Sequence, residues 1–264
     1  MSFEFLAVHA YNPGPMTGPG NTTWLVPGRV PVLIDAGTGH PRHVADLEAA
    51  LDGAALRAVL VTHVHSDHAS GAPVLRDRMP GARFAKMPSE RDARYPVEWQ
   101  PLADGDVIEA GDTTVVALHT PGHAADHLCF WHEESRTVFA GDLAVKGTTV
   151  VIPASSGGDL GAYLESLERV LALEPARLLP AHGPVIDAPD KLLRMYIQHR
   201  LDREGQVLAA LRAGDTTPEA VVDRVYAGLA DPLVPMARES VTAHLRKLEK
   251  DGRARREADR WTII

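Results

Sequence analysis

Apolar and polar positions along the first 188 residues form two kinds of pattern. Apolar runs of strand length, rich in β-branched residues, occur at residues 3–10, 22–26, 30–35, 56–61, 83–86, 113–118, 128–131, 137–139 and 177–179. Apolar residues at helical spacing occur at residues 40–51, 71–79 and 157–173. Strands and helices mixed in this order predict an α/β fold, with an early hairpin around the Pro27–Gly28 turn.

The pattern changes at residue 189. Residues 190–212 have the apolar spacing of one long helix, and residues 218–225 and 235–251 predict two further helices, the last with a polar face that includes His244. Residues 253–264 fit a basic β-hairpin. We therefore divide the chain into a body, a connecting helix and a small C-terminal module, which span residues 1–188, 189–213 and 214–264.

The densest candidate chemistry follows the strand-like run at residues 56–61. Within the six residues 63–68, four are candidate ligands, namely three histidines and one aspartate. Imidazole and carboxylate together favour zinc, manganese or ferrous iron, whereas calcium prefers oxygen ligands alone. In an extended segment His63 and His65 point the same way, while Asp67 and His68 come where the chain turns. This spacing suggests two neighbouring metal ions.

Three more side chains occur in the same sequence context. In each case a short apolar strand is followed by a small or turn residue and then by a residue of a type that binds metal. They are His123, Asp142 and His182. Strands that end at one edge of a sheet would bring all these groups together. We therefore predict seven metal ligands: His63, His65, Asp67, His68, His123, Asp142 and His182. Asp35, in a turn after a strand, is predicted to support the site, and Cys129 is predicted to pack in the core.

The series His63-x-His65-x-Asp67-His68, His123, Asp142 and His182 resembles the full metal set of the metallo-β-lactamase superfamily, from about residue 5 to residue 188. The resemblance implies a four-layer αββα sandwich. It also implies that one ion is held by His63, His65 and His123, the other by Asp67, His68 and His182, with Asp142 and a hydroxide between them. The expected cofactors are two divalent ions, Zn²⁺ first, with Mn²⁺ or iron as alternatives. Asp67 is the expected catalytic group, because it can orient the nucleophile.

The C-terminal order of helix, helix and hairpin resembles a small winged-helix module. Together with Asn12-Pro13-Gly14 and Thr120-Pro121-Gly122-His123, it makes the chain similar to the β-lactamase-like protein 2 group, which includes an endoribonuclease acting on single-stranded RNA. That group's N-terminal loop usually reads Gly-Thr-Asn-Thr. This chain reads Gly20-Asn21-Thr22-Thr23, so the asparagine has moved by one place.

The net charge of the chain helps to distinguish between the possible substrates. The chain has a net charge of −8, and residues 1–188 carry 13 basic against 23 acidic residues, so no global positive field attracts nucleic acid. Two hydrolase hypotheses stay open: a binuclear endoribonuclease on single-stranded RNA, and an acyl thioesterase of the hydroxyacylglutathione hydrolase type. A mononuclear iron persulfide dioxygenase and a non-enzymatic binding protein are further alternatives.

Substrate contacts are predicted at positions outside the metal set: Trp24, His199, Arg200 and Arg203. The loop at residues 146–158 should border the substrate. The segment at residues 87–106, with Arg91, Arg94 and Tyr95, either lines the cleft or is solvated loop.

Targeting signals are the last sequence feature. The N-terminus lacks a basic segment followed by an apolar one, and no run approaches 18 apolar residues. A single cysteine fits a reducing compartment. We therefore expect a cytoplasmic protein that does not enter the membrane, acts on a small acyl substrate or on RNA, and is either a monomer or a homodimer.

Overall fold

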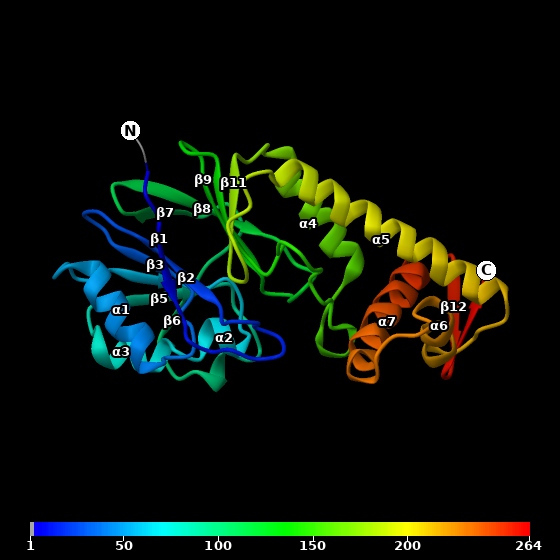
Figure 1. The fold of residues 1–264 in the computed structure, drawn as a ribbon. Helices are drawn as coiled ribbons and strands as arrows, with labels where there is room; N and C mark the ends of the chain where they lie inside the picture. Colours follow the sequence, from blue (N-terminus) through cyan, green and yellow to red (C-terminus); the bar gives the residue numbers. More distant parts are fainter. Residues whose placement is uncertain (1–2) are drawn as a thin grey trace.

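The computed structural model describes residues 3–264, and two facing β-sheets form the larger part of the molecule (Figure 1). The first sheet has six strands in the order β1-β2-β3-β4-β5-β6. Their bounds are β1 Leu6–His9, β2 Thr22–Val26, β3 Val32–Ile34, β4 Ala58–Leu60, β5 Arg83–Lys86 and β6 Trp99–Pro101. Strands β3 to β6 are parallel, and β3 and β4 are wholly buried, as parallel strands covered on both faces usually are.

The second sheet has five strands in the order β11-β10-β9-β8-β7. Their bounds are β7 Val107–Ala110, β8 Thr113–His119, β9 Leu128–His132, β10 Thr137–Gly141 and β11 Arg177–Pro180. Strands β10 and β11 are parallel, and the other neighbours are antiparallel. Every residue of β9 and β10 is buried, because these central strands are covered on both faces.

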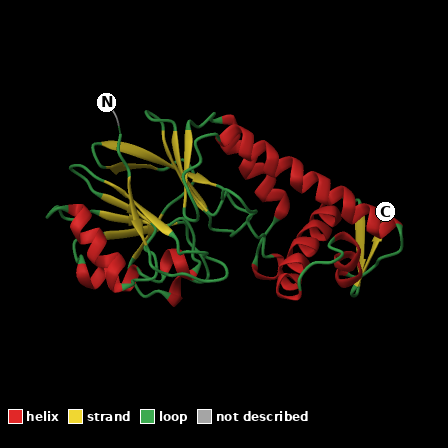
Figure 2. Cartoon of the chain, in the orientation of Figure 1, coloured by secondary structure: helices red, strands yellow, loops and turns green. Residues whose placement is uncertain are grey.

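Helices cover the outer face of each sheet (Figure 2). The helices of the body are α1 Pro41–Leu51, α2 Ser66–Ala69, α3 Ala72–Arg78 and α4 Leu160–Ala172. One apolar core joins α1 and α3 to the first sheet, a second lies between the sheets, and a third joins the second sheet to α4 and to the start of α5 (Pro189–Arg212). The four-layer αββα sandwich is therefore confirmed.

Helix α5 runs from the body into the C-terminal module (Figure 1). The module adds α6 Pro218–Val225, α7 Val234–Lys250, β12 Ala254–Glu257 and β13 Arg260–Ile263. Its own core includes Val207, Val241, Leu245 and Trp261. The predicted order of helix, helix and hairpin is confirmed, but His244 is fully buried rather than on a polar outer face. Burial follows because α7 also packs against α4 and α5.

Residues 87–106 differ from the expected irregular segment. They contain a 3-10 turn at Asp92–Arg94 and edge strand β6. Strand β6 is half-buried or exposed along its length and ends in Pro101, so it lacks the apolar alternation that identifies a strand in sequence.

Within residues 3–264, no helix combines the length and the apolar character needed to cross a membrane.

Candidate metal centre

The histidine-rich stretch leaves the end of β4 and turns directly into α2. His65 is the residue that precedes α2, Asp67 lies in its first turn and His68 in its last. The side chains of His63 and His68 are fully buried, and those of His65 and Asp67 are half-buried. The chain therefore turns where the sequence indicated, and all four side chains lie at the edge where the parallel strands end.

Two glycines allow further strand ends to approach this edge. Gly122 precedes His123 with φ +138°, and a Cβ there would lie 2.4 Å from Cα of Tyr163 in α4. Gly141 precedes Asp142 with φ +47°, and a Cβ there would lie 2.8 Å from Nε2 of His127. Both positions require glycine, because the backbone is left-handed and another segment lies too close for a side chain.

The seven predicted ligands form two adjoining groups. In each group, one ligand atom from every member lies within 4.8 Å of the others, and the groups are His63, His65, His123 and Asp142, and Asp67, His68 and His182. Nδ1 of His65 lies 2.8 Å from Nε2 of His63 and 2.9 Å from Nε2 of His123.

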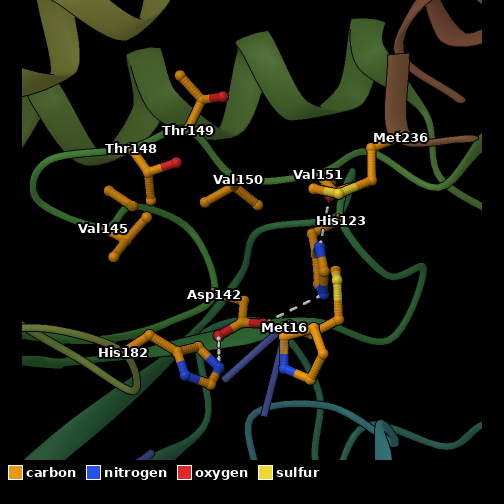
Figure 3. A pocket seen from close by; sticks show the side chains of 13 residues that line it. Met16, His123, Asp142, Val145, Thr148, Thr149, Val150, Val151, His182 and Met236 are labelled. Atoms are coloured by element: carbon orange, nitrogen blue, oxygen red, sulfur yellow. Dashed lines mark hydrogen bonds and ion pairs between the residues drawn. The ribbon is translucent and has the colours of Figure 1, made fainter. Parts of the chain in front are cut away.

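Asp142 lies between the two groups. Its Oδ2 is 3.3 Å from Nε2 of His123, and its Oδ1 is 3.3 Å from Nε2 of His182 (Figure 3). Oδ1 is also 3.4 Å from Nε2 of His68. The carboxylate therefore directs one oxygen to each group, which is the arrangement of a bridging ligand.

The side chains fit two divalent ions. Nε2 of His68 and Oδ1 of Asp142 are buried and have no hydrogen-bond partner among residues 3–264, although buried polar atoms normally have one. Nitrogen lone pairs and carboxylate oxygens converge at both groups, and a cation at each would satisfy them. Five imidazoles and two carboxylates are also a donor set that zinc, manganese and iron accept.

Ionisation states support the same fit. Burial opposes the charge of Asp142, but neighbouring imidazoles, that of His68 first, hold its pKa well below its ordinary value. Burial likewise opposes the charge of Asp67, but the imidazoles of His68 and His182 lower its pKa to about 2. Burial, reinforced by His123, lowers the pKa of His65 to about 4. Ionised carboxylates and a neutral imidazole are the forms that bind metal at neutral pH.

Asp35 contacts His68 and fixes the orientation of its ring. The sequence analysis predicted this supporting role for Asp35. Its Oδ2 lies 2.8 Å from Nδ1 of His68, and its Oδ1 accepts hydrogen bonds from the backbone N–H and the hydroxyl of Thr62. Burial works against charge on His68, but the carboxylates of Asp35, Asp67 and Asp142 raise its pKa well above the ordinary value. Nδ1 is thus committed to Asp35, and a metal ion bound at Nε2 would replace the proton that the raised pKa favours there.

Three further supports were not predicted. His127 is fully buried, and its Nε2 accepts the backbone N–H of Asp142 at 3.0 Å. Nδ1 of His123 lies 2.8 Å from the carbonyl oxygen of Val151. Asn21, the displaced asparagine, donates from Nδ2 to the carbonyl oxygen of Asp67 at 2.7 Å. Only Asn21 carried a sequence signal, because its loop departs by one place from the pattern of the group that the chain resembles.

The cavity beside the centre has an apolar side and a cationic side. The apolar side is formed by Met16, Val145, Val150, Val151 and Met236 (Figure 3). The cationic side is a recess of about 380 Å³ where Arg91 and Arg94 lie near Tyr95 and the metal-ligand side chains. Part of the segment at residues 87–106, with Arg91, Arg94 and Tyr95, therefore lines the cleft, and so does the loop at residues 146–158.

Trp24 does not contact this cavity, and its predicted role is corrected. Its side chain is 7% exposed, lies in the core between the sheets and donates from Nε1 to the carbonyl oxygen of Pro180. His199, Arg200 and Arg203 also lie off the metal cavity, in a neighbouring one that borders it. The sequence placed these three residues on one helix but gave no signal for the wall between the cavities.

Both parts of the chain match known protein families. Residues 15–182 match the model of the metallo-β-lactamase superfamily, and residues 217–261 match that of the β-lactamase-associated winged helix domain. An atrochrysone carboxyl ACP thioesterase of Aspergillus chevalieri is 36% identical, covering 97% of this chain and 86% of that protein. A β-lactamase-like protein 2 homologue of Caenorhabditis elegans is 33% identical, covering 92% and 83%.

A solved structure extends the likeness to three dimensions. A β-lactamase domain protein from Burkholderia ambifaria superposes with a TM-score of 0.83 at 21% identity, covering 98% of this chain and 91% of that one. The two sheets, the paired His/Asp groups and the C-terminal module thus agree with the sequence matches. This chain belongs to the metallo-β-lactamase superfamily of metal-dependent hydrolases and carries the β-lactamase-associated winged helix domain.

Proposed function

We propose that the chain is an acyl thioesterase, which hydrolyses a thioester to a carboxylic acid and a thiol. The observation that carries this proposal is the apolar wall beside the metal centre, which includes Val145, Val150 and Met236. An acyl chain would gain about 25 cal/mol for each Å² of apolar surface that it buries there. A path for RNA would instead need cations along the backbone and aromatic rings for the bases.

Two further observations favour an acyl substrate. The relative with 36% identity over nearly the whole chain is named as a thioesterase that acts on an acyl carrier protein. The body of this chain also has ten more acidic than basic residues, which repels a polyanion.

The side chains suit the reaction. His63, His65 and His123 would hold one ion, Asp67, His68 and His182 the other, and Asp142 would lie between them. Divalent ions bound there would lower the pKa of a water molecule to about 7 and polarise the substrate carbonyl.

Asp67 has the exposure and the charge to direct the attacking water. Its side chain lines the cavity and is 20% exposed, so its carboxylate can accept a hydrogen bond from that water. The water oxygen forms a bond to the acyl carbon, the carbon–sulfur bond breaks, and the thiolate leaves and takes up the proton that the water has lost.

A second candidate rests on the cationic side of the cavity. Arg91 and Arg94 lie beside the ligand side chains, and the ring of Tyr95 lies next to them. These groups could receive a phosphate and a base of single-stranded RNA. The winged helix gives this candidate less support, because α7 faces the body. Glu239 accepts the backbone N–H of Ser155 at 2.8 Å, and Lys250 pairs with Asp159.

The deciding experiment offers the purified, metal-loaded protein an octanoyl N-acetylcysteamine thioester and a single-stranded RNA oligonucleotide, each with and without chelator. We expect thioester hydrolysis that the chelator abolishes, and no cleavage of RNA. RNA cleavage without thioester turnover would refute the proposal and favour the second candidate. One iron per chain, with oxygen consumption on a persulfide, would assign the protein to the dioxygenases.

A further inference from the structure

A second cavity, of about 330 Å³, lies between the body and the C-terminal module. Helix α5 contributes His199, Arg200 and Arg203 to it, and the module contributes residues that include Tyr226 and Ser240. This cavity shares the segment at residues 148–151 and the side chain of Met236 with the apolar cavity beside the metal centre. The two cavities therefore adjoin along this segment.

The second cavity is cationic and lacks a counter-charge. Arg200 is 5% exposed and donates from Nη2 to the carbonyl oxygen of Val150, and Arg203 donates from Nη1 to that of Val225 at 3.3 Å. Within residues 3–264, no salt bridge joins either guanidinium to a carboxylate. Glu204, on the same helix, pairs with Lys247 at 2.9 Å and with Arg253.

Several buried side-chain nitrogens in this region have no partner among the described residues. Nε of Arg200, Nε of Arg203 and Nδ1 of His199 are buried and have no hydrogen-bond partner among residues 3–264. The guanidinium of Arg203 lies 4.1 Å from the ring centroid of Tyr226, which holds the fork in place without neutralising it. Buried cations normally have an anionic partner, because removing a charge from water is costly. The pattern therefore points to an anion that binds from outside the chain.

We propose that this cavity binds an anionic group of the substrate, a carboxylate or a phosphate, and so makes the enzyme selective for charged thioesters. The carboxylate would stand at the far end of the acyl chain, and the phosphate would stand on the arm that carries the thiol. Paired guanidinium donors suit both groups, because their fork matches two oxygens of one anion. This proposal rests on the proposed thioesterase function for the identity of the substrate.

The test compares thioesters that differ only in charge. One pair is the octanoyl and the 7-carboxyheptanoyl thioester of N-acetylcysteamine, and the other is the octanoyl thioester of pantetheine and of 4′-phosphopantetheine. We expect one of the two anionic members to have a KM roughly tenfold or more below that of its neutral partner, at similar kcat. The pair that shows the difference identifies the source of the anion.

Variants assign the effect to the cavity. Arg203→Gln should remove the preference through KM, Arg203→Lys should restore part of it, and Arg212→Gln, on an exposed turn of the same helix, should leave it unchanged. Arg200→Gln serves as a second variant, provided that its circular dichroism matches the wild type. Equal KM values within both pairs, or a preference that survives Arg203→Gln, would overturn the proposal.

A binding measurement separates this proposal from the proposed function. Suberate, octanoate and inorganic phosphate are titrated into the metal-loaded wild type and Arg203→Gln by calorimetry. Binding of suberate or phosphate that depends on Arg203, without turnover of any thioester, would support the anion site and refute the thioesterase. Turnover without such binding would do the reverse. RNA cleavage that falls in Arg203→Gln would assign the cavity to a nucleic acid and overturn the proposal.

Discussion

Several residues at the metal centre are held by a neighbour that fixes their orientation, and Asp35 shows this most clearly. Its carboxylate contacts both Thr62 and His68. It also has φ +67°, in the left-handed region that asparagine tolerates well. Asp35→Asn therefore removes the charge at little cost to the backbone.

We expect Asp35→Asn to weaken metal binding in the group that contains His68 by roughly 10- to 100-fold, the usual effect of losing such a support. Chelator competition with zinc or manganese measures the two affinities separately. The other group should keep its affinity, because its histidines do not contact Asp35. Equal affinities in variant and wild type would show that Asp35 does not act through His68.

Substitution of Asp67 tests whether the second metal ion is bound and needed for hydrolysis. Asp67→Ala removes one ligand and the group that orients the water, so we expect the ion content to fall from two toward one. Hydrolysis should fall by roughly a hundredfold or more. Metal analysis and kcat/KM are measured on the same preparation, and Asp223→Ala, an exposed carboxylate in α6, is the control. Full activity in Asp67→Ala would contradict a mechanism that needs both groups.

At the scale of elements, the loop between β8 and β9 must pass close to α4 to deliver His123. Gly122→Ala would place a methyl group 2.4 Å from Cα of Tyr163, so the loop or the helix has to shift. We expect a loss of stability of about 2 kcal/mol or more, together with loss of metal from the group that contains His123.

The matched control is Gly53→Ala, which also has a positive φ, +80°, but nothing within 4 Å of the added methyl group. It carries the cost of a positive φ without the clash. Urea unfolding and metal analysis of both variants isolate the contact with α4. Equal losses of stability in the two variants would mean that this contact does not constrain the His123 loop.

At the scale of the whole molecule, α7 packs against α4 of the body and against α5, and His244 lies buried near Arg200 and Arg203 of α5. Burial, together with the nearby cations of Arg200, Arg203 and Lys247, lowers the pKa of His244 to about 3. Its unfolded value is about 6.5, so the unfolded chain binds more protons between these two pH values. The stability that the neutral imidazole contributes is complete above pH 6.5 and is lost as the pH falls toward 3.

We therefore expect the free energy of unfolding to fall between pH 7 and pH 5. His244→Leu should reduce that fall by at most about 2 kcal/mol, since one proton contributes about 1.4 kcal/mol per pH unit. Urea unfolding at both pH values, on wild type and variant, measures the difference. An identical fall in the two proteins would show that His244 titrates alike in the folded and unfolded chains.

Local sequence patterns were enough to predict the fold class, the order of nearly all elements and the seven candidate ligands. Strand and helix periodicity is a local property, and each ligand follows its own apolar strand by a few residues. Residues 63–68, His123, Asp142 and His182 could therefore be found without knowing which strands are neighbours. Strand β6 was not predicted, because an exposed edge strand needs no apolar alternation.

The folded chain revealed the features that depend on contacts between distant segments. It moved Trp24 into the core, because the second sheet covers the face of β2 that carries this residue. It placed His127 under Asp142 through a backbone N–H, which no side-chain pattern encodes. It also set Arg200 and Arg203 against a cavity that the body and the module form together. Such contacts arise from packing over long separations in sequence, and local patterns of hydrophobic and polar residues cannot specify them.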